Sequence, residues 1–358
     1  MFPRTLLAAL LLAPLASLAA PRYTVTPLPA DTNPLGINNA GQIVGDRPGA
    51  EGQRGFIWSR GALTTMGTLG GPDSSAAAIN QSGQAAGHAS LPGGQSRAVR
   101  HAGGTLSELV IPASTHSLGT AINNAGQVAG QYLDSAGQYR AFLHSGGAST
   151  DLGTLGGNFA YAAGINNAGH VVGVSALDDT SPFLAHAFLY ANGSMTDLGT
   201  LGGSYSAAAD INDAGLVVGN AWVRGSEHAF LYVNGKMTDL GTLGGRRSFA
   251  HAVNQGGQVV GRSDIPGDAG SAAFLYEGAA LVDLNTLIDP ALGYTVHNAT
   301  GINDSGHIAA YGCRVGYRAE GSECGGLLLQ PSPAPEPGTW AMLLAGLGML
   351  GWRRLRMT

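Results

Sequence analysis

The sequence has little charge, few aromatic residues and only two cysteines. Charged residues make up 11% of the 358-residue chain, aromatic residues make up 7%, and Lys236 is the single lysine. Between the two terminal segments described below, the body carries 22 acidic and 14 basic residues, so no basic stripe is available to bind nucleic acid. The chain is nevertheless too apolar for general disorder and long enough for one large core.

Common catalytic and cofactor motifs are also missing from the body, which has no G-x-S-x-G, H-E-x-x-H, C-x-x-C or P-loop sequence. The one G-x-G-x-x-G match, at Gly346, Gly348 and Gly351, falls in an apolar terminal segment with no strand before it. We therefore expect no cofactor, no metal and no catalytic residue. The chain does have 57 glycines, but they show no Gly-X-Y period, which excludes a collagen helix.

The N-terminal end has the layout of a secretory signal peptide. Arg4 precedes an apolar run that ends in small residues at Ser17 and Ala19, which predicts a signal peptide over residues 1–19 with cleavage after Ala19. An uncleaved signal anchor is the alternative. Either reading predicts an exported chain.

The C-terminal end consists of a proline-rich linker (331–337), an apolar run (338–352) and a basic tail (353–358). Fifteen helical residues rise about 22 Å, and the hydrocarbon core is about 30 Å thick, so the apolar run is a borderline transmembrane helix. The positive-inside rule places the tail in the cytoplasm on account of its arginines, Arg353, Arg354 and Arg356.

The order of Pro335, Glu336 and Pro337, a short apolar helix and a basic tail resembles the PEP-CTERM sorting signal of Gram-negative bacteria. This resemblance covers about 24 residues and implies two processing partners, signal peptidase and an exosortase. It also implies an inner-membrane intermediate held by the C-terminal helix, followed by transfer to the cell surface or the extracellular space. Cells with this system often make exopolysaccharide.

The body is built from seven copies of a unit of about 43 residues, a period typical of propellers and solenoids. The clearest element of the unit begins at seven positions: "INNAGQIVG" at Ile37, "INQSGQAAG" at Ile79, "INNAGQVAG" at Ile122, "INNAGHVVG" at Ile165, "INDAGLVVG" at Ile211, "VNQGGQVVG" at Val253 and "INDSGHIAA" at Ile302.

Four short strand patterns recur along the units, as in "AYAAGIN", "HVVG", "AFLY" and "MTDLGTL". The N-x-x-G segment between the first two suits a tight turn, and Asn192-Gly193 and Asn234-Gly235 are strong hairpin signals between the last two.

Counting the strands favours a closed ring. The third pattern occurs seven times but the fourth only six times, and the mature N-terminus, Tyr23 to Pro29, supplies the missing strand. A last blade closed by the first strand of the chain hides the edges of a circular propeller, whereas an open solenoid does not need it. We predict an all-β fold, a seven-bladed β-propeller over residues 20–330, with the alanine-rich first strand of each blade innermost.

The third strand of the repeat carries the triplet His-Ala-Phe at His186 and again at His228. The repeat therefore resembles the HAF family of extracellular bacterial proteins, although only two of the seven units keep the literal triplet. The resemblance implies no catalytic residue.

Pairing outward from the Asn192-Gly193 turn places His186 diagonally opposite Asp197 on one face of a hairpin. The same register gives three further basic and acidic pairs: Arg97 with Glu108, Arg140 with Asp151, and His228 with Asp239. A catalytic group is normally singular, so a pair that recurs in four blades predicts structural clamps.

Cys313 and Cys324 are placed between the second and third strands of the last blade. In an exported chain this pair predicts a disulfide. Two free thiols and a metal-binding pair are the alternatives, and the metal pair lacks further ligands nearby.

Ligand binding is expected on loops that depart from the repeat. The connection between blades six and seven is longer than the others, and second-to-third-strand loops lengthen in blade four, which includes Phe183, and in blade seven. We predict a binding surface for sugar or polyanion at the junction of blades six and seven, with Asp264 and Asp268 nearby; its residues are Tyr294, His297, Arg314, Tyr317 and Arg318. Solvated loop residues, and weak calcium binding at Asp178-Asp179, are the alternatives.

Together these features predict an exported, non-enzymatic repeat protein that binds matrix exopolysaccharide or another surface protein. A polysaccharide hydrolase or lyase on the same scaffold is one alternative. It requires paired acidic groups near the central channel, where the first strands offer mainly alanine and Asp210 is the exception. A purely structural surface protein is the other alternative.

Overall fold

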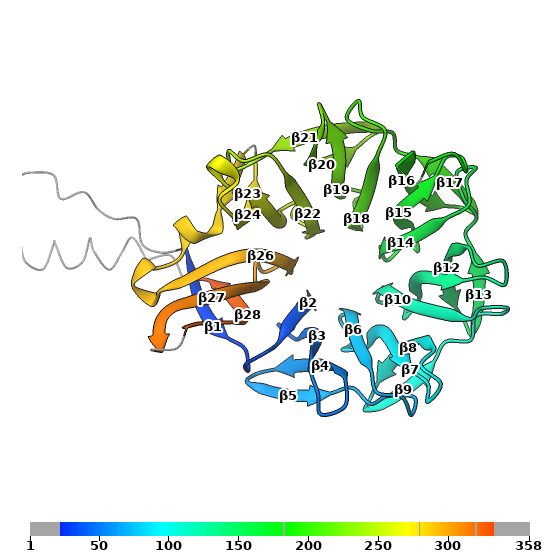
Figure 1. The fold of residues 1–358 in the computed structure, drawn as a ribbon, viewed down its shortest axis with the longest axis horizontal. Helices are drawn as coiled ribbons and strands as arrows, with labels where there is room; N and C mark the ends of the chain where they lie inside the picture. The colour runs from blue at the N-terminus through cyan, green and yellow to red at the C-terminus, as the bar shows by residue number, and fades with distance from the viewer. Residues whose placement is uncertain (1–21, 182, 279, 319–320, 333–358) are drawn as a thin grey trace, which may run out of the picture.

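The computed structural model describes residues 22–181, 183–278, 280–318 and 321–332. Seven four-stranded antiparallel sheets surround a central axis, which confirms the predicted seven-bladed β-propeller (Figure 1). In the first six blades the strands follow one another outward in sequence order, so the alanine-rich strand of each blade is innermost as predicted.

The first three blades begin after the N-terminal strand. Blade one contains β2 (Asn33–Ile37), β3 (Ile43–Pro48), β4 (Gln53–Ser59) and β5 (Ala62–Thr65). Blade two contains β6 (Ser74–Ile79), β7 (Ala85–Ser90), β8 (Ser96–Ala102) and β9 (Thr105–Glu108). Blade three contains β10 (His116–Ile122), β11 (Val128–Leu133), β12 (Tyr139–Ser145) and β13 (Ala148–Asp151).

The next three blades repeat this order. Blade four contains β14 (Ala160–Ile165), β15 (Val171–Ala176), β16 (Ala185–Ala191) and β17 (Ser194–Asp197). Blade five contains β18 (Ser206–Ile211), β19 (Val217–Val223), β20 (Ser226–Val233) and β21 (Lys236–Gly241). Blade six contains β22 (Ser248–Val253), β23 (Val259–Asp264), β24 (Ser271–Glu277) and β25 (Ala280–Asp283).

Blade seven joins the two ends of the propeller. It contains β26 (Tyr294–Ile302), β27 (Ile308–Arg318) and β28 (Gly321–Pro331), and β1 (Tyr23–Pro27) forms its outer strand. The pairing of β1 with β28 runs from Tyr23 opposite Pro331 to Pro27 opposite Leu327. This confirms the predicted closure by the first strand of the chain.

The core lies between blades rather than at one centre. Five phenylalanines of the third strands are fully buried, and the second blade has Val99 at this position; the five are Phe56, Phe142, Phe188, Phe230 and Phe274. Phe188, for example, packs in one cluster with alanines of blade three such as Ala129 and Ala141. Burial of this apolar surface, at about 25 cal/mol per Å², holds neighbouring blades together.

The glycine of the repeated "VVG" segment is required by a bulge. In blade four the register of β14 against β15 shifts between Ala162 and Gly164. A Cβ atom on Gly173, opposite this shift, would lie 1.9 Å from the carbonyl oxygen of Tyr161. A side chain therefore does not fit where the innermost strands bend.

The asparagine after each repeated Ile or Val forms a closed ring of hydrogen bonds. Its Nδ2 donates to the carbonyl oxygen of the same asparagine in the next blade at 2.9–3.2 Å, and Asn303 closes the ring by donating to Asn38. Its Oδ1 accepts backbone amides of its own turn, as Asn166 does from Ala168 and His170. The ring members are Asn38, Asn80, Asn123, Asn166, Asn212, Asn254 and Asn303.

The next residue of each turn forms a second ring. Its backbone amide donates to the side-chain oxygen of its counterpart in the next blade at 2.8–3.1 Å, and Asp304 donates back to Asn39. The repeated Ile-Asn-(Asn, Gln or Asp) segment is thus explained by bonds between blades.

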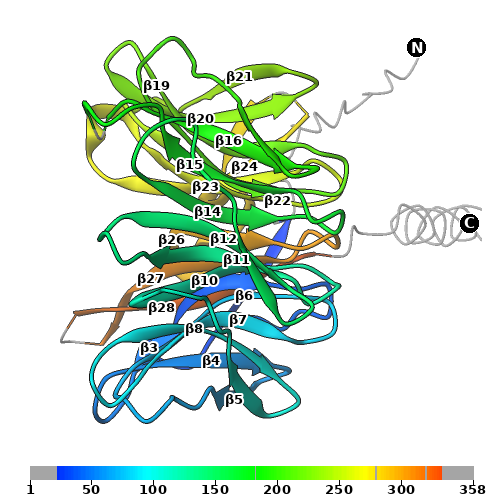
Figure 2. The same ribbon diagram turned by 90° about the vertical axis from the view of Figure 1, so that its right-hand side faces the viewer.

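The loops lie on two opposite faces of the ring, because the strands run across it (Figure 2). The asparagine turns occupy one face. The connections between second and third strands and between successive blades, such as residues 177–181 and 198–205, occupy the other, which we call the connection face. In Figure 2 the hairpin of β27 and β28 reaches beyond neighbouring loops.

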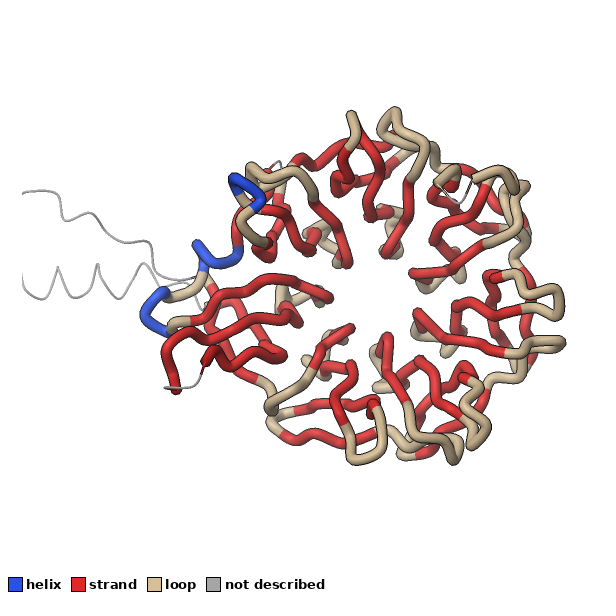
Figure 3. The backbone as a smooth tube through the Cα atoms, in the orientation of Figure 1, coloured by secondary structure: helices blue, strands red, loops and turns tan. Residues whose placement is uncertain are grey.

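Three short 3-10 helices are the helices of the described residues, and they gather at blades six and seven (Figure 3). They are η1 (Pro266–Asp268), η2 (Leu284–Leu287) and η3 (Pro290–Leu292). Within the described ranges, no helix is long and apolar enough to cross a membrane. The predicted signal peptide (1–19), transmembrane helix (338–352), PEP residues and basic tail (353–358) lie outside those ranges.

Candidate ligand-binding site

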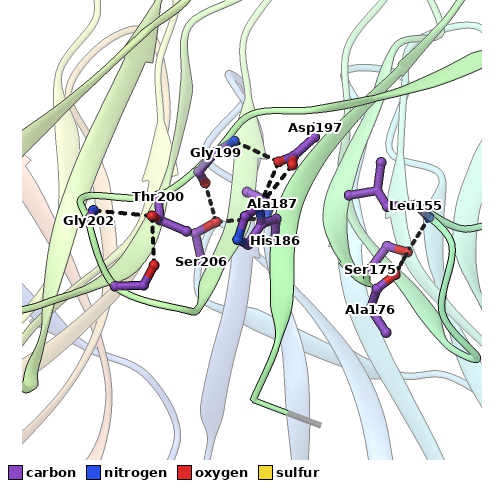
Figure 4. Close-up of polar contacts among 11 residues, drawn as sticks. Leu155, Ser175, Ala176, His186, Ala187, Asp197, Gly199, Thr200, Gly202 and Ser206 are labelled. Atoms are coloured by element: carbon purple, nitrogen blue, oxygen red, sulfur yellow. Dashed lines mark hydrogen bonds and ion pairs between the residues drawn. The ribbon is translucent and has the colours of Figure 1, made fainter. Parts of the chain in front are cut away.

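Three of the four predicted clamps have their partners in contact. Nδ1 of His186 lies 2.9 Å from Oδ2 of Asp197, and His228 and Asp239 have the same separation. Nε of Arg97 lies 3.3 Å from Oε1 of Glu108. Figure 4 shows His186 directed at Asp197, whose carboxylate also accepts the amide of Gly199 at 2.7 Å. Each contact lies within one hairpin.

The fourth predicted clamp is not formed. Arg140 binds Asp134 instead, with Nε 3.2 Å from Oδ2, and Asp151 accepts a hydrogen bond from the hydroxyl of Tyr132 at 3.2 Å. Asp134 lies in the turn before β12, within reach of the long arginine side chain. The backbone amide of Gln138 donates to Asp134 and, with the guanidinium, holds the pKa of that carboxyl below its usual value.

The rest of the repeated motif is also engaged internally. Oγ of Ser206 accepts the amide of Ala187 at 2.8 Å and donates to the carbonyl of Gly199 at 2.6 Å, which links blade five to blade four (Figure 4). Oγ of Ser248 accepts the amide of Ala229 in the same way. The most repeated side chains therefore bond to the protein itself.

Cys313 and Cys324 form a disulfide with an S–S distance of 2.04 Å. They lie directly opposite each other in the ladder of β27 and β28. Their expected position in a loop is wrong, because both strands extend through the segment as one long hairpin.

Of the five residues predicted to bind a ligand at blades six and seven, the structure describes the side chains of Tyr294, His297 and Arg314. The guanidinium of Arg314 lies 5.4 Å from the ring centroid of Tyr294, beside a small pocket of about 160 Å³. His297 instead faces blade six, where Nδ1 lies 3.2 Å from the carbonyl oxygen of Ser271. The side chains of Tyr317 and Arg318 lie outside the described residues.

A larger pocket of about 690 Å³ opens on the connection face between blades five and six. We call it the charged pocket. Its side chains come from three segments that follow or precede strands: the turn between β19 and β20, the connection from β21 to β22, and the end of β23 with its loop. The lining includes Trp222, Glu227, Arg246, Arg247, Arg262, Asp264 and Asp268.

All three carboxylates of the charged pocket have donors within the protein. Nε of Arg247 lies 3.0 Å from Oδ2 of Asp264, and Asp268 accepts the backbone amide of Arg246 at 2.9 Å. Glu227 accepts the side-chain amide of Asn220 at 3.1 Å.

Two arginines of the charged pocket form no ion pair with a described residue: these are Arg246 and Arg262, and both are exposed. The guanidinium of Arg262 lies 4.7 Å from the ring centroid of Phe249, so a cation–π contact holds it in place. The pocket therefore presents two accessible guanidinium groups beside carboxylates that already have partners.

An aromatic surface adjoins the charged pocket across blades four and five. It borders a hollow of about 570 Å³, and we call it the aromatic platform; its residues are Phe159, Tyr161, Phe183, Tyr205 and Trp222. The rings of Phe183 and Trp222 are stacked, with centroids 5.9 Å apart and planes at 25°. Phe183 is 60% exposed.

Backbone bonds hold the platform in position. The amide of Trp222 donates to the carbonyl of Tyr205 at 2.9 Å. The amide of Ala176 donates to the carbonyl of Phe159 at 3.0 Å. Tyr205 also forms an isolated β-bridge with Ala185 of the preceding blade. Burial, followed by the nearby charge of Glu227, raises the pKa of Tyr205 and keeps its hydroxyl protonated at neutral pH.

Trp222 and Glu227 line both hollows, so the two surfaces are continuous. Sequence reasoning identified Phe183, Asp264 and Asp268 as neighbours of variable loops but missed the rest. A signal was present, because "NFAYAAGIN", "SYSAAADIN" and "RRSFAHAVN" place Phe, Tyr and Arg where the repeat otherwise has small or polar residues.

The inner strands surround a central hollow of about 210 Å³, which is lined mainly by small and aliphatic residues. Asp210 lines it and accepts the amides of Ile211 at 2.8 Å and Val253 at 2.9 Å. Burial raises the pKa of Asp210 to about 6, and burial lowers the pKa of His251 nearby. Both Asp210 oxygens thus accept backbone amides, one within blade five and one from blade six.

Among the described residues, no group of three or more His, Cys, Asp or Glu side chains is arranged to hold a metal ion. Oδ1 of Asp178, the alternative calcium ligand, accepts hydrogen bonds from the amide of Thr180 at 2.8 Å and from the Thr180 hydroxyl at 2.7 Å. Asp178 therefore shapes the loop that carries Phe183.

Two family models match the chain. One describes a PEP-CTERM protein-sorting motif and matches residues 333–356. The chain carries an exosortase sorting signal. The motif confirms the resemblance seen at Pro335 to Pro337 and implies export to the cell envelope or surface. The other model is described as a protein of unknown function (DUF3466) and matches residues 158–329. Neither description names HAF repeats, so that likeness stays a resemblance.

None of the curated proteins matches the chain. Among solved structures, a puromycin-hydrolyzing peptidase of Mycobacterium tuberculosis has a TM-score of 0.50 and 11% identity, and the match covers 84% of this chain and 51% of the peptidase. The chain thus spans about half the length of that enzyme. YCF48 bound to D1 peptide has a TM-score of 0.50 and 10% identity, with 90% of this chain and 100% of YCF48 covered. At these identities the likeness shows the propeller fold alone.

Proposed function

We propose that this protein is an exported, non-enzymatic binding module that associates with matrix polysaccharide at the cell surface or outside the cell. The PEP-CTERM motif supports export. One observation supports binding: aromatic and charged side chains that are not part of the repeat gather around two adjoining hollows of the connection face. Sugars offer a flat C–H face that stacks on aromatic rings and hydroxyl groups that pair with arginine and carboxylate side chains.

We infer that the pairs in contact act as structural clamps. Each one fixes the two outer strands of its blade, and each recurs at the same place in the unit. Partly exposed pairs of this kind contribute about 0.3–1 kcal/mol each.

We also infer that signal peptidase and an exosortase process the chain by way of an inner-membrane intermediate in a Gram-negative host. The basic tail and the 338–352 segment support this route.

A polysaccharide hydrolase or lyase remains the second candidate, because Glu227, Asp264 and Asp268 line the same pocket and do not repeat. Glycosidases use a pair of carboxyl groups, one as acid and one as base or nucleophile. Engagement of all three carboxylates by internal donors favours binding over hydrolysis.

The test is retention of the full chain, purified in mild detergent, on a panel of immobilised polysaccharides. The binding function predicts retention on at least one polysaccharide without release of soluble oligosaccharide. Release of oligosaccharides with time would establish the enzyme instead. Failure to retain the protein on any polysaccharide would contradict both and favour a purely structural role.

A further inference from the structure

The aromatic platform and the charged pocket form one continuous surface, and the ligand that fits it must be long enough to touch both. The platform belongs to blades four and five, and the charged pocket lies between blades five and six. Trp222 and Glu227 stand at the junction of the two. An extended chain of linked rings fits this shape better than a single small molecule does.

The platform suits sugar rings better than a protein partner. Protein interfaces are organised around an apolar centre with a polar rim. Of the five platform rings only Phe183 is exposed, and guanidinium and carboxylate groups lie close to it, so the apolar area is small for such a centre. A backbone bond joins Trp222 to Tyr205 and their rings are in contact, so little conformational entropy is lost when a ligand stacks on them.

The charges define the ligand further. Asp264, Asp268 and Glu227 each have a donor within the protein. Arg246 and Arg262 form no ion pair with a described residue and are exposed in the pocket wall. A guanidinium group pairs in bidentate fashion with a carboxylate or a phosphate, and the anionic group of a uronic-acid polysaccharide is a carboxylate, so a polysaccharide ligand should carry carboxylates.

We propose that the surface from Phe183 to Arg246 is a binding groove for an acidic polysaccharide. Its sugar rings stack on the aromatic platform, and its carboxylates pair with Arg246 and Arg262. This inference rests on the proposed function and adds the site and the ligand class to it.

The experiment compares polygalacturonate with its fully methyl-esterified form, which has the same sugar backbone but no carboxylate charge. Affinity of the full chain is measured by calorimetry at low and high salt. We expect polygalacturonate to bind about tenfold or more tightly than the ester, because each guanidinium–carboxylate pair adds a charged hydrogen bond. We also expect salt to weaken this preference, since exposed charges are screened.

Variants separate the two parts of the groove. Arg246→Ala and Arg262→Gln should each lower affinity for polygalacturonate about tenfold and leave affinity for the ester unchanged. Phe183→Ala should lower affinity for both probes; because Phe183 is 60% exposed, its loss should not unfold the protein. Arg60→Ala is the matched control, since Arg60 lies in the β4–β5 turn on the opposite face. All variants are checked for an unchanged melting temperature.

The outcomes distinguish this inference from the proposed function. The protein could bind a polysaccharide while the Phe183, Arg246 and Arg262 variants bind as tightly as Arg60→Ala does. In that case the groove is not the binding site, and the proposed binding function stands. Equal affinity for both probes would overturn the proposal that the ligand is acidic. If the protein is retained on no polysaccharide at all, the proposed function fails together with the groove.

Discussion

Single residues of this chain fall into two groups, those that repeat and those that do not. Repeated side chains such as Asn166, Ser206 and Asp197 bond to the protein itself. Pairs within one hairpin could be predicted from the sequence, because a tight turn sets the register of its two strands. The partner of Arg140 could not be predicted in this way. Asp134 lies in the turn before β12, outside the hairpin whose register was used.

Asp210 provides a prediction on pH at the residue scale. Its folded-state pKa of about 6 lies above the usual value of 3.8, so the folded protein binds a proton more tightly than the unfolded chain. Its contribution to stability is therefore complete below about pH 4 and is lost as the pH rises to about 6. Because one pKa unit corresponds to about 1.36 kcal/mol, this loss of stability amounts to about 2–3 kcal/mol.

The Asp210→Asn variant retains a side-chain oxygen to accept the amide of Val253 and has no charge to bury. Its amide nitrogen also meets the N–H of Ile211, which costs stability at every pH, so we expect the stability of the variant relative to the wild type to rise by about 2–3 kcal/mol between pH 4 and pH 7. Urea unfolding of both proteins across this range measures the difference. A difference that is the same at both pH values would show that Asp210 does not titrate in this way.

At the scale of elements, each blade is a local unit that depends on its neighbours. The sheet within a blade could be predicted because period, turn residues and strand pattern all lie within about 43 residues. The hydrogen bonds between blades could not be predicted, because the ring of asparagines joins residues that lie 42 or more positions apart in the sequence. The sequence showed the asparagine in a turn but not its partner in the next blade.

We predict that Asn166→Ala destabilises the propeller by about 3 kcal/mol. Asn166 is 4% exposed, and its side chain makes three hydrogen bonds, two within its turn and one to Asn212, so the substitution leaves buried backbone groups without partners. Chemical unfolding monitored by circular dichroism measures the loss. The exposed Asn158→Ala serves as control and should change stability by less than about 0.5 kcal/mol. Equal effects of the two substitutions would contradict a role for the ring.

At the scale of the whole molecule, stability depends on closing the ring. The outer strand of blade seven comes from the other end of the propeller, about 300 residues away in sequence. Tyr23 is 3% exposed and packs in a cluster with Leu275 and Leu329, which joins blade six to blade seven. Without β1 the edge of β28 would be open to pairing with other chains.

We expect Tyr23→Ala to destabilise the whole propeller by about 3 kcal/mol, because it empties a buried site at the closure. Thr24→Ala, at an exposed position of the same strand, should cost less than about 1 kcal/mol. Urea unfolding and limited proteolysis at blade seven compare the two variants. If they prove equally stable, closure by β1 does not limit stability.

The number of blades, the order of strands and the closure by Tyr23–Pro27 follow from the sequence alone. Each depends on a repeat period, on turn residues or on a strand count, and all of these are read along the chain. The groove is different. Phe159, Phe183, Tyr205 and Trp222 belong to separate segments of two blades, and Arg246 and Arg262 to a third. They meet only when packing between blades closes the ring, because that packing, and no local pattern, sets which loops become neighbours.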